Sequence, residues 1–187
     1  KPSGTVSQLV DSASGIHARF SAYYIRRVRS DGKDPISDFL KDAGVPWERD
    51  VMNTDNYVFS FPVKAPEGAK SVDDQNVREQ LDLWEIYQNH WCEHKPSVTI
   101  YYSDDEFLEA GQWLWKRLES CSGISFLPRT DHVYQQAPYE AITEEQYKNL
   151  KSEMPSDINW DDLGKFEKTD TTTGTQELAC VAGSCEI

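Results

Sequence analysis

The stretch "SVTIYYSDDEFLEAGQWLWKRLESCSGISFLP" (residues 97–128) contains two strand candidates and a helix between them. Residues 97–102 and 123–128 are rich in β-branched and aromatic side chains, which favour strands. Residues 104–120 predict a helix, with Ser103 as N-cap, acidic residues in the first turn and basic residues in the last. A helix of this length between two strands is typical of a crossover that joins parallel strands.

The same alternation extends toward the N-terminus. Residues 56–64 predict a strand, and residues 72–94 predict the longest helix, capped by Ser71 and ended by Pro96. Helical spacing places Val77, Leu81, Trp84, Tyr87 or Gln88, and Trp91 on one face. From Tyr57 to Leu127 the order is strand, helix, strand, helix, strand, which predicts an α/β protein with a mostly parallel sheet or barrel wall.

The rest of the chain carries shorter elements and a polar tail. The predicted elements are a strand at 23–29, a helix at 36–44 ended by Gly44 and Pro46, an aromatic loop at 129–143, a helix at 143–150 and a short helix at 159–166. After Phe166 the apolar content falls sharply, so we expect residues 168–187 to form a flexible tail.

Composition limits the class of protein. The 187 residues are 38% hydrophobic and 12% aromatic, which predicts a folded domain rather than a disordered chain. A formal net charge of −13 argues against binding nucleic acid through a basic surface. No apolar run reaches the length of a membrane span, and two interior cysteines without obvious partners fit a reducing cytoplasm. Because the chain starts with a loop-like "KPSGT", we expect it to be a piece of a larger polypeptide.

The ending "ELACVAGSCEI" (177–187) places a cysteine pair on this tail. Cys180 and Cys185 face apart in a helix and lie about 17 Å apart in an extended chain, so they pair only if the chain turns at Gly183. Four interpretations stay open: a structural disulfide, incidental thiols, half of a metal site, and a mobile redox dithiol. The last explains a dithiol outside any core best, because a bridge closing so short a terminal loop stabilises little.

Two further patterns suggest binding chemistry. "PSGT" (2–5) precedes an apolar-periodic stretch, so its backbone N–H groups at a helix start suit a phosphate, although a plain N-cap turn explains the same pattern. His90 and His94 share a helix face, but "HWCEH" is not a zinc-protease motif, and we expect no metal site. The aromatic residues of "EQLDLWEIYQNHW" and "QWLWKRL", including their tryptophans, are expected to face the core, with contact to a ligand as the alternative.

Longer strings indicate a family. These strings are "KPSGTVSQLVDSASGIHARFSAYYIRRVR" (1–29), "FSFPVKAPEGA" (59–69), "YQNHWCEHKPSVTI" (87–100), "SFLPRTDHVYQQAPYEAIT" (125–143) and "CVAGSC" (180–185). In this order they resemble the C-terminal part of adenosylcobalamin-dependent, class II ribonucleotide reductase, and above all its monomeric branch that reduces ribonucleoside triphosphates. The resemblance runs from Pro2 to Cys185.

The resemblance implies a fold and a set of roles. It implies that residues 1–167 form the C-terminal part of a ten-stranded α/β barrel, in which a thiyl radical forms after cobalt–carbon homolysis, and that residues 168–187 form a redox-shuttle tail. It implies that Ser3, Gly4, Thr5 and the Val6 amide hold the phosphates of the ribonucleotide substrate. It also implies that Cys180 and Cys185 carry electrons from thioredoxin, and that adenosylcobalamin binds mainly to upstream parts of the enzyme.

The sequence also departs from the family pattern. It contains no radical-site "NxCxE" motif and no further cysteine pair, so we expect an upstream half, fused or split, to supply both. Cys92 and Cys121 look structural. The alternative hypothesis is a stand-alone phosphate- or partner-binding module, derived from the reductase and without catalysis of its own.

Overall fold

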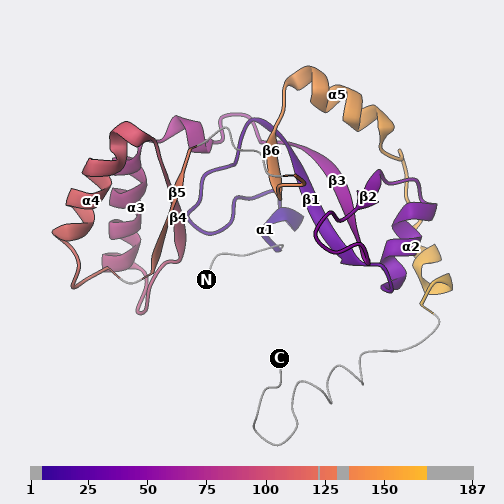
Figure 1. Cartoon of the computed structure of the whole chain (residues 1–187), viewed down its shortest axis with the longest axis horizontal. Helices are drawn as coiled ribbons and strands as arrows, with labels where there is room; N and C mark the ends of the chain where they lie inside the picture. The colour runs from indigo at the N-terminus through magenta and orange to yellow at the C-terminus, as the bar shows by residue number, and fades with distance from the viewer. Residues whose placement is uncertain (1–5, 122, 130–134, 168–187) are drawn as a thin grey trace, which may run out of the picture. The chain divides into compact units, whose positions relative to one another are not determined.

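The computed structural model describes residues 6–121, 123–129 and 135–167, and these residues fall into two compact units. The first unit contains the described residues up to Arg26 and those from Pro62 to Leu150; the second contains Arg27–Phe61 and the described residues from Lys151 onward. In chain order the elements are α1 (Val6–Leu9), β1 (Tyr23–Asp31), α2 (Pro35–Asp42), β2 (Trp47–Arg49), β3 (Asn56–Lys64), the 3₁₀ helix η1 (Val72–Asp74), α3 (Val77–His90), β4 (Val98–Tyr102), the 3₁₀ helix η2 (Asp104–Glu106), α4 (Phe107–Trp115), β5 (Ile124–Pro128), β6 (Tyr139–Ala141), α5 (Glu144–Glu153) and the 3₁₀ helix η3 (Trp160–Lys165) (Figure 1). This mixture confirms the predicted α/β class.

In the first unit, β4 and β5 form the parallel pair expected from residues 97–128. The register places Val98 opposite Ile124 and Tyr102 opposite Pro128. Helices α3 and α4 lie side by side next to this pair (Figure 1). The buried core of the unit consists of Val77, Leu81, Trp84, Val98, Ile100, Ala110 and Trp113. The crossover prediction is therefore confirmed, because one apolar face of each helix covers the strands.

Helix α3 begins at Val77, later than the sequence predicts, because the chain makes two helical starts. The first is η1, with Ser71 as its N-cap, and it ends where Gln75 is extended. The second uses Asn76: its side chain accepts the Glu79 N–H at 2.8 Å, and the Glu79 carboxylate accepts the Asn76 N–H at 3.0 Å. This capping box fixes the true start of the helix.

The two helices bury only some of their tryptophans, although the sequence prediction placed them all in the core. Trp84 and Trp113 are 1% and 3% exposed, and their rings meet edge to face with centroids 6.1 Å apart. Trp91 and Trp115 are 81% and 76% exposed, so the prediction is wrong for both. The reason is helix length, since Trp91 follows the last residue of α3 and Trp115 is itself the last residue of α4.

The other sheet has the strand order β2-β3-β1-β6, and β1 and β3 each contribute residues to both units. Strand β2 pairs antiparallel with β3, with Trp47 opposite Phe59, and β6 pairs antiparallel with β1, with Tyr139 opposite Arg26. The prediction of one mostly parallel wall from Tyr57 to Leu127 is therefore wrong for β3. The sequence reading missed β2, which a short connection folds back onto β3 as an antiparallel neighbour.

The second unit has its own core around α2. Asp34 caps this helix by accepting the Ile36 N–H at 3.1 Å, and Gly44, with φ of 81°, follows its C-terminal end as predicted. The buried residues are Phe39, Leu40, Val45, Tyr57 and Phe59, joined by the partly buried Ile36, Phe61, Met154, Ile158, Leu163 and Phe166. The predicted helix at 159–166 is the 3₁₀ helix η3, which adds Leu163 to this core.

Asp50 gives the second unit a pH dependence that can be measured. The Met52 N–H donates to one carboxylate oxygen at 2.9 Å and Arg29 Nε donates to the other at 2.9 Å. The Met52 bond and the Arg29 guanidinium outweigh burial and hold the pKa of Asp50 below its ordinary value. A lowered folded-state pKa stabilises the fold above the unfolded value of about 3.9, and this contribution is lost as the pH falls through the lowered value.

We therefore expect Asp50→Asn to lower the free energy of unfolding at neutral pH and to flatten its decline on acidification. The measurement is urea unfolding at a series of pH values from about 6 to about 3. Arg29→Met is the matched control: it keeps the Met52 bond, so it should retain part of the decline. An Asp50→Asn protein with the wild-type pH profile would contradict the assignment.

Candidate functional site

The residues predicted to act on substrate and electron donor lie mostly outside the described part of the chain. Ser3, Gly4 and Thr5 precede the first described residue, and Cys180 and Cys185 follow the last. Val6 is described: it begins α1, and its side chain is 67% exposed. The phosphate loop and the redox dithiol therefore stay predictions. The candidate site among the described residues consists of the segment that follows α1 and the residues that this segment contacts.

Arg19 closes the loop after α1. Its side chain is 5% exposed. Nη2 donates to the Asp11 carbonyl oxygen and, at 2.8 Å, to the Asp11 carboxylate, and Nη1 donates to the Tyr24 hydroxyl at 3.4 Å. Burial disfavours the charged guanidinium, but these bonds to Tyr24 and Asp11 outweigh it and raise the pKa of Arg19. The arginine is thus a fixed cation whose charge is already paired with Asp11.

The backbone of Arg19 attaches the same loop to the segment before α3. Its N–H donates to the Lys70 carbonyl at 2.9 Å, and its carbonyl accepts the Val72 N–H at 2.8 Å, which forms a parallel bridge opposite Ser71. Two backbone bonds and a buried side chain hold the loop at this point. The loop that follows the predicted phosphate site is therefore built into the first unit rather than free of it.

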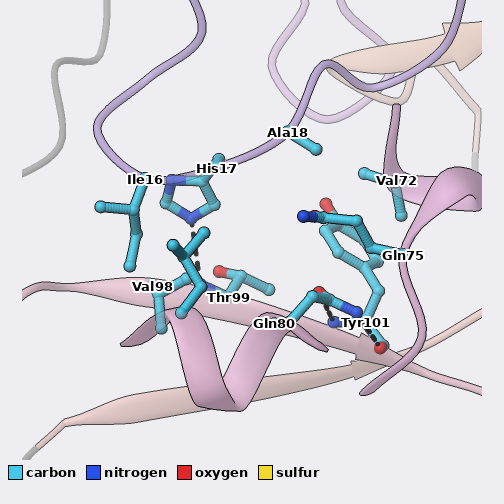
Figure 2. A pocket seen from close by; sticks show the side chains of 10 residues that line it. Ile16, His17, Ala18, Val72, Gln75, Gln80, Val98, Thr99 and Tyr101 are labelled. Atoms are coloured by element: carbon cyan, nitrogen blue, oxygen red, sulfur yellow. Dashed lines mark hydrogen bonds between the residues drawn. The ribbon is translucent and has the colours of Figure 1, made fainter. Parts of the chain in front are cut away.

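His17 attaches the loop to strand β4. Its Nδ1 lies 2.7 Å from the Ser14 carbonyl oxygen and its Nε2 lies 3.0 Å from the Thr99 nitrogen (Figure 2). The carbonyl can only accept and the amide can only donate, so the contacts assign the donor role to Nδ1 and the acceptor role to Nε2. His17 is therefore a structural connector between the loop and the strand.

Gln80, from α3, caps the same edge of β4. Its Oε1 accepts the Tyr101 N–H at 2.9 Å and its Nε2 donates to the Tyr101 carbonyl at 2.8 Å (Figure 2). A side-chain amide here makes both hydrogen bonds that a neighbouring strand would make. With His17 on the Thr99 N–H, side chains bind three backbone groups on the edge of β4 that faces away from β5, which hinders pairing of this part of the edge with another strand.

Two hollows lie beside these contacts. The smaller, shown in Figure 2, holds about 20 Å³, which is room for about one water molecule. The larger holds about 260 Å³ and includes the rings of Phe20, Tyr24, Tyr101 and Tyr139 in its wall. Burial, and to a lesser extent the neighbouring Tyr139, raises the pKa of Tyr101, so its hydroxyl stays protonated at neutral pH. The larger hollow thus offers stacking surfaces and neutral hydroxyl groups.

No metal site is formed by the described residues: they contain no group of three or more His, Cys, Asp or Glu side chains placed to hold an ion. Cys92 and Cys121 are free thiols and half-buried. Burial raises the pKa of the Cys121 thiol, which disfavours the reactive thiolate. None of the helices described has the length and hydropathy that crossing a bilayer requires.

Sequence reasoning missed the roles of His17 and Arg19. Both lie inside the string 1–29 that carries the family resemblance, but no local motif distinguishes them. Their partners, Thr99 and Lys70, are far away in the sequence, so only the folded chain shows the contacts.

Comparisons with known proteins show that the whole chain is similar in sequence to one group of enzymes. No protein-family model matches the chain. In an alignment of 197 positions that covers 100% of the chain, it is 32% identical to a probable adenosylcobalamin-dependent ribonucleoside-triphosphate reductase of Dictyostelium discoideum, and it covers 24% of that protein. The corresponding reductase of Euglena gracilis is 32% identical over 99% of the chain, and that of Lactobacillus gasseri 29% identical over 100%; the chain covers 26% of each.

A solved structure agrees with these relatives. The crystal structure of a B12-dependent, class II ribonucleotide reductase superposes on 91% of the chain with a TM-score of 0.72 and 28% identity, and the match covers 24% of that chain. The resemblance seen in the sequence is thereby confirmed. The chain spans about a quarter of the length of the reductases that it matches.

Proposed function

We propose that this chain is the C-terminal segment of an adenosylcobalamin-dependent ribonucleotide reductase, which reduces ribonucleoside triphosphates with thioredoxin as electron donor. The observation that carries the proposal is similarity along the whole chain, at 29–32% identity, to reductases of this name. In this proposal residues 1–167 complete a ten-stranded α/β barrel with the upstream half, fused or separate, and residues 168–187 form the shuttle tail. The enzyme acts in the cytoplasm.

The hollows among the described residues are small for adenosylcobalamin. The four larger ones hold about 260 to 440 Å³, which reaches only the lower part of the range of about 300–1,000 Å³ for pockets that take drug-sized ligands, and this cofactor is larger than such ligands. We therefore assign the cofactor mainly to the upstream half and derive no step of the reaction through it. The roles proposed for this chain are phosphate binding and electron delivery.

Phosphate binding is assigned to Ser3, Gly4, Thr5 and the Val6 amide. Short hydroxyl side chains and backbone N–H groups at a helix start are suitable donors for a triphosphate, and glycine allows the backbone to approach it closely. The position of Val6 at the first turn of α1 agrees with this assignment.

Replacing Gly4 with valine in the full-length enzyme should raise the KM for the nucleotide by about 10- to 100-fold, the loss of one or two hydrogen bonds to a charged group. The measurement is steady-state reduction over a range of substrate concentrations. Gly111→Ala is the control, because a Cβ added at this helical position meets no atom within 4 Å. An unchanged KM in Gly4→Val would show that this loop does not bind the substrate phosphates.

Electron delivery is assigned to Cys180 and Cys185. Each reduction of substrate leaves an internal cysteine pair as a disulfide. A tail thiolate attacks this disulfide, the second tail thiol resolves the mixed disulfide, and two electrons and two protons pass inward. The tail is then a disulfide, which the thioredoxin dithiol reduces in the same way. About twenty flexible residues span roughly 25 Å on average, which gives such a tail the reach to alternate between two partners.

The direct test uses the full-length protein that contains this chain. It is incubated with a ribonucleoside triphosphate, adenosylcobalamin and reduced thioredoxin, and deoxyribonucleotide is quantified. We expect product that depends on both cobalamin and thioredoxin. If a correctly folded full-length protein forms no cobalamin-dependent product but binds nucleotide or a protein partner, the chain is a binding module and the proposed function is wrong.

A further inference from the structure

Arg129 lies directly after β5, at the carboxyl end of the parallel pair. Its backbone N–H donates to the Tyr102 carbonyl, at the end of β4, at 2.7 Å. Its guanidinium serves separate acceptors: Nη1 donates to Glu106 Oε2 at 3.1 Å, and Nη2 donates to the carbonyl oxygens of Val72, at 3.2 Å, and Gln75. The side chain is 22% exposed. One arginine thus holds the ends of both strands and the connection that precedes α3.

Glu106 is the other half of this arrangement. Its Oε1 accepts the Val77 N–H, at the start of α3, at 2.9 Å, and its Oε2 accepts the Ser103 N–H, just after β4, at 2.8 Å. Burial opposes the carboxylate, but these two N–H donors and the charge of Arg129 outweigh it and hold the pKa of Glu106 below its ordinary value. Each side-chain hydrogen bond described for the pair therefore has an ionised partner, which strengthens it.

The position of the pair matters as much as its bonds. In folds with parallel strands, substrates bind at the carboxyl ends of the strands, on the loops that follow them. Arg129 and Glu106 fix the two loop starts at this end. They also hold the connection carrying Val72, which lines both hollows described above, and Gln75, which lines the smaller one. A shift of the pair would move this wall and both loop starts together.

A second ion pair in the same unit provides a comparison. Arg117 and Glu85 form a bidentate pair, with Nε and Nη2 at 2.6 and 2.9 Å from the two carboxylate oxygens, and their side chains are 25% and 32% exposed. This pair joins the turn after α4 to α3, and none of its bonds reaches the carboxyl end of β4 or β5. Arg117 uses its donors on one carboxylate, whereas Arg129 spreads its donors over a carboxylate and two backbone carbonyls.

From this contrast we infer that Arg129 and Glu106 are positioning residues of the proposed reductase. They hold the carboxyl ends of β4 and β5 in the geometry that the reaction requires. In this role they touch neither substrate nor reacting atoms. They fix the positions at which the loops after β4 and β5 begin. The inference rests on the proposed function. Arg117 and Glu85 have no such role and only join two helices.

The test compares Arg129→Met with Arg117→Met in the full-length enzyme. Each removes the charge and hydrogen bonds of a half-buried arginine and keeps a similar apolar stem, so the two should lower the melting temperature comparably. We expect Arg129→Met to lower kcat about 30- to 100-fold, as small displacements at a reacting site do, with KM changed less than threefold. Arg117→Met should keep kcat within about threefold, because the contacts that it loses, the partly exposed Glu85 ion pair and the contact of the guanidinium with the Trp113 ring, do not hold the carboxyl ends of β4 and β5.

Chemical rescue separates positioning from general destabilisation. Arg129→Ala leaves a space that free guanidinium can enter, so millimolar guanidinium should restore part of its kcat. Arg117→Ala should show no such recovery. Should Arg129→Met fail to fold, Arg129→Lys keeps the charge but reaches fewer acceptors, and we expect it to be folded with kcat lowered about tenfold. Glu106→Gln should likewise lower kcat by a larger factor than it changes KM.

The outcomes distinguish this inference from the proposed function. A wild-type full-length protein that forms no deoxyribonucleotide overturns the proposed function and the positioning role with it. An active wild type in which Arg129→Met and Arg117→Met lower kcat by the same factor, with no guanidinium rescue of Arg129→Ala, overturns the positioning role alone.

Discussion

A full-length enzyme with Cys180 replaced by serine should complete about one turnover from its pre-reduced internal cysteines and then stop when thioredoxin is the reductant. In the proposed mechanism the tail thiols deliver electrons and do not touch the nucleotide, so the first reduction should not need them. Cys185→Ser should behave in the same way, because exchange requires both an attacking and a resolving thiol. The measurement is deoxyribonucleotide formed per enzyme, in single and multiple turnover.

A small dithiol that diffuses to the internal disulfide should restore continued turnover in both variants, since it bypasses the tail. Cys121→Ser is the matched control: this thiol is half-buried against the core of the first unit, and its replacement should not separate single from multiple turnover. A Cys180→Ser enzyme that cycles normally with thioredoxin would show that the tail dithiol is not the shuttle.

The largest loss of stability is expected from Trp84→Ala. This side chain is 1% exposed, packs edge to face on Trp113 and donates its indole N–H to the Pro96 carbonyl at 2.8 Å. Removing it should lower the free energy of unfolding by about 3–5 kcal/mol for the lost packing, and the orphaned carbonyl adds about 1–3 kcal/mol. Losses of this size approach the whole stability of a typical domain.

Trp115→Ala provides the control for this experiment. Trp115 is 76% exposed at the end of α4, so its removal should change the free energy of unfolding by less than about 0.5 kcal/mol. Denaturant unfolding of the full-length protein, followed by circular dichroism, measures both variants. Equal losses for Trp84→Ala and Trp115→Ala would mean that the exposed face of α4 is covered in the complete enzyme.

Local sequence signals located most elements of this chain. Runs of strand-forming residues predicted β1, β3, β4 and β5, and the boundaries of β3 are as predicted. The predicted helix boundaries were less accurate. The apolar spacing continues beyond the true ends of both helices, whereas α3 begins only after its N-cap Asn76 and α4 already ends at Trp115. Strand β2 was missed because three residues carry too little periodicity to be recognised.

The functional residues also fall into those that the sequence reveals and those that only the folded structure reveals. The family resemblance, Ser3–Val6 and the pair Cys180 and Cys185 came from contiguous motifs, whose residues are read directly from the chain. His17, Gln80 and Arg129 carry no motif, and Glu106 belongs to a local capping box with Ser103 that does not reveal its other contacts. The contacts His17–Thr99, Gln80–Tyr101 and Arg129–Glu106 each join residues at least 20 positions apart, so they exist only after the chain has folded.

The sequence by itself therefore determined the α/β class, the parallel strand–helix–strand unit and the resemblance to class II reductases, because these depend on side-chain periodicity and contiguous strings. Only the tertiary structure decided that β3 belongs to an antiparallel sheet, that Trp84 is buried while Trp91 is exposed, and that Arg129 meets Glu106. Such facts depend on which distant segments pack together. That choice is made by the burial and hydrogen bonding of the whole chain, and no local pattern encodes it.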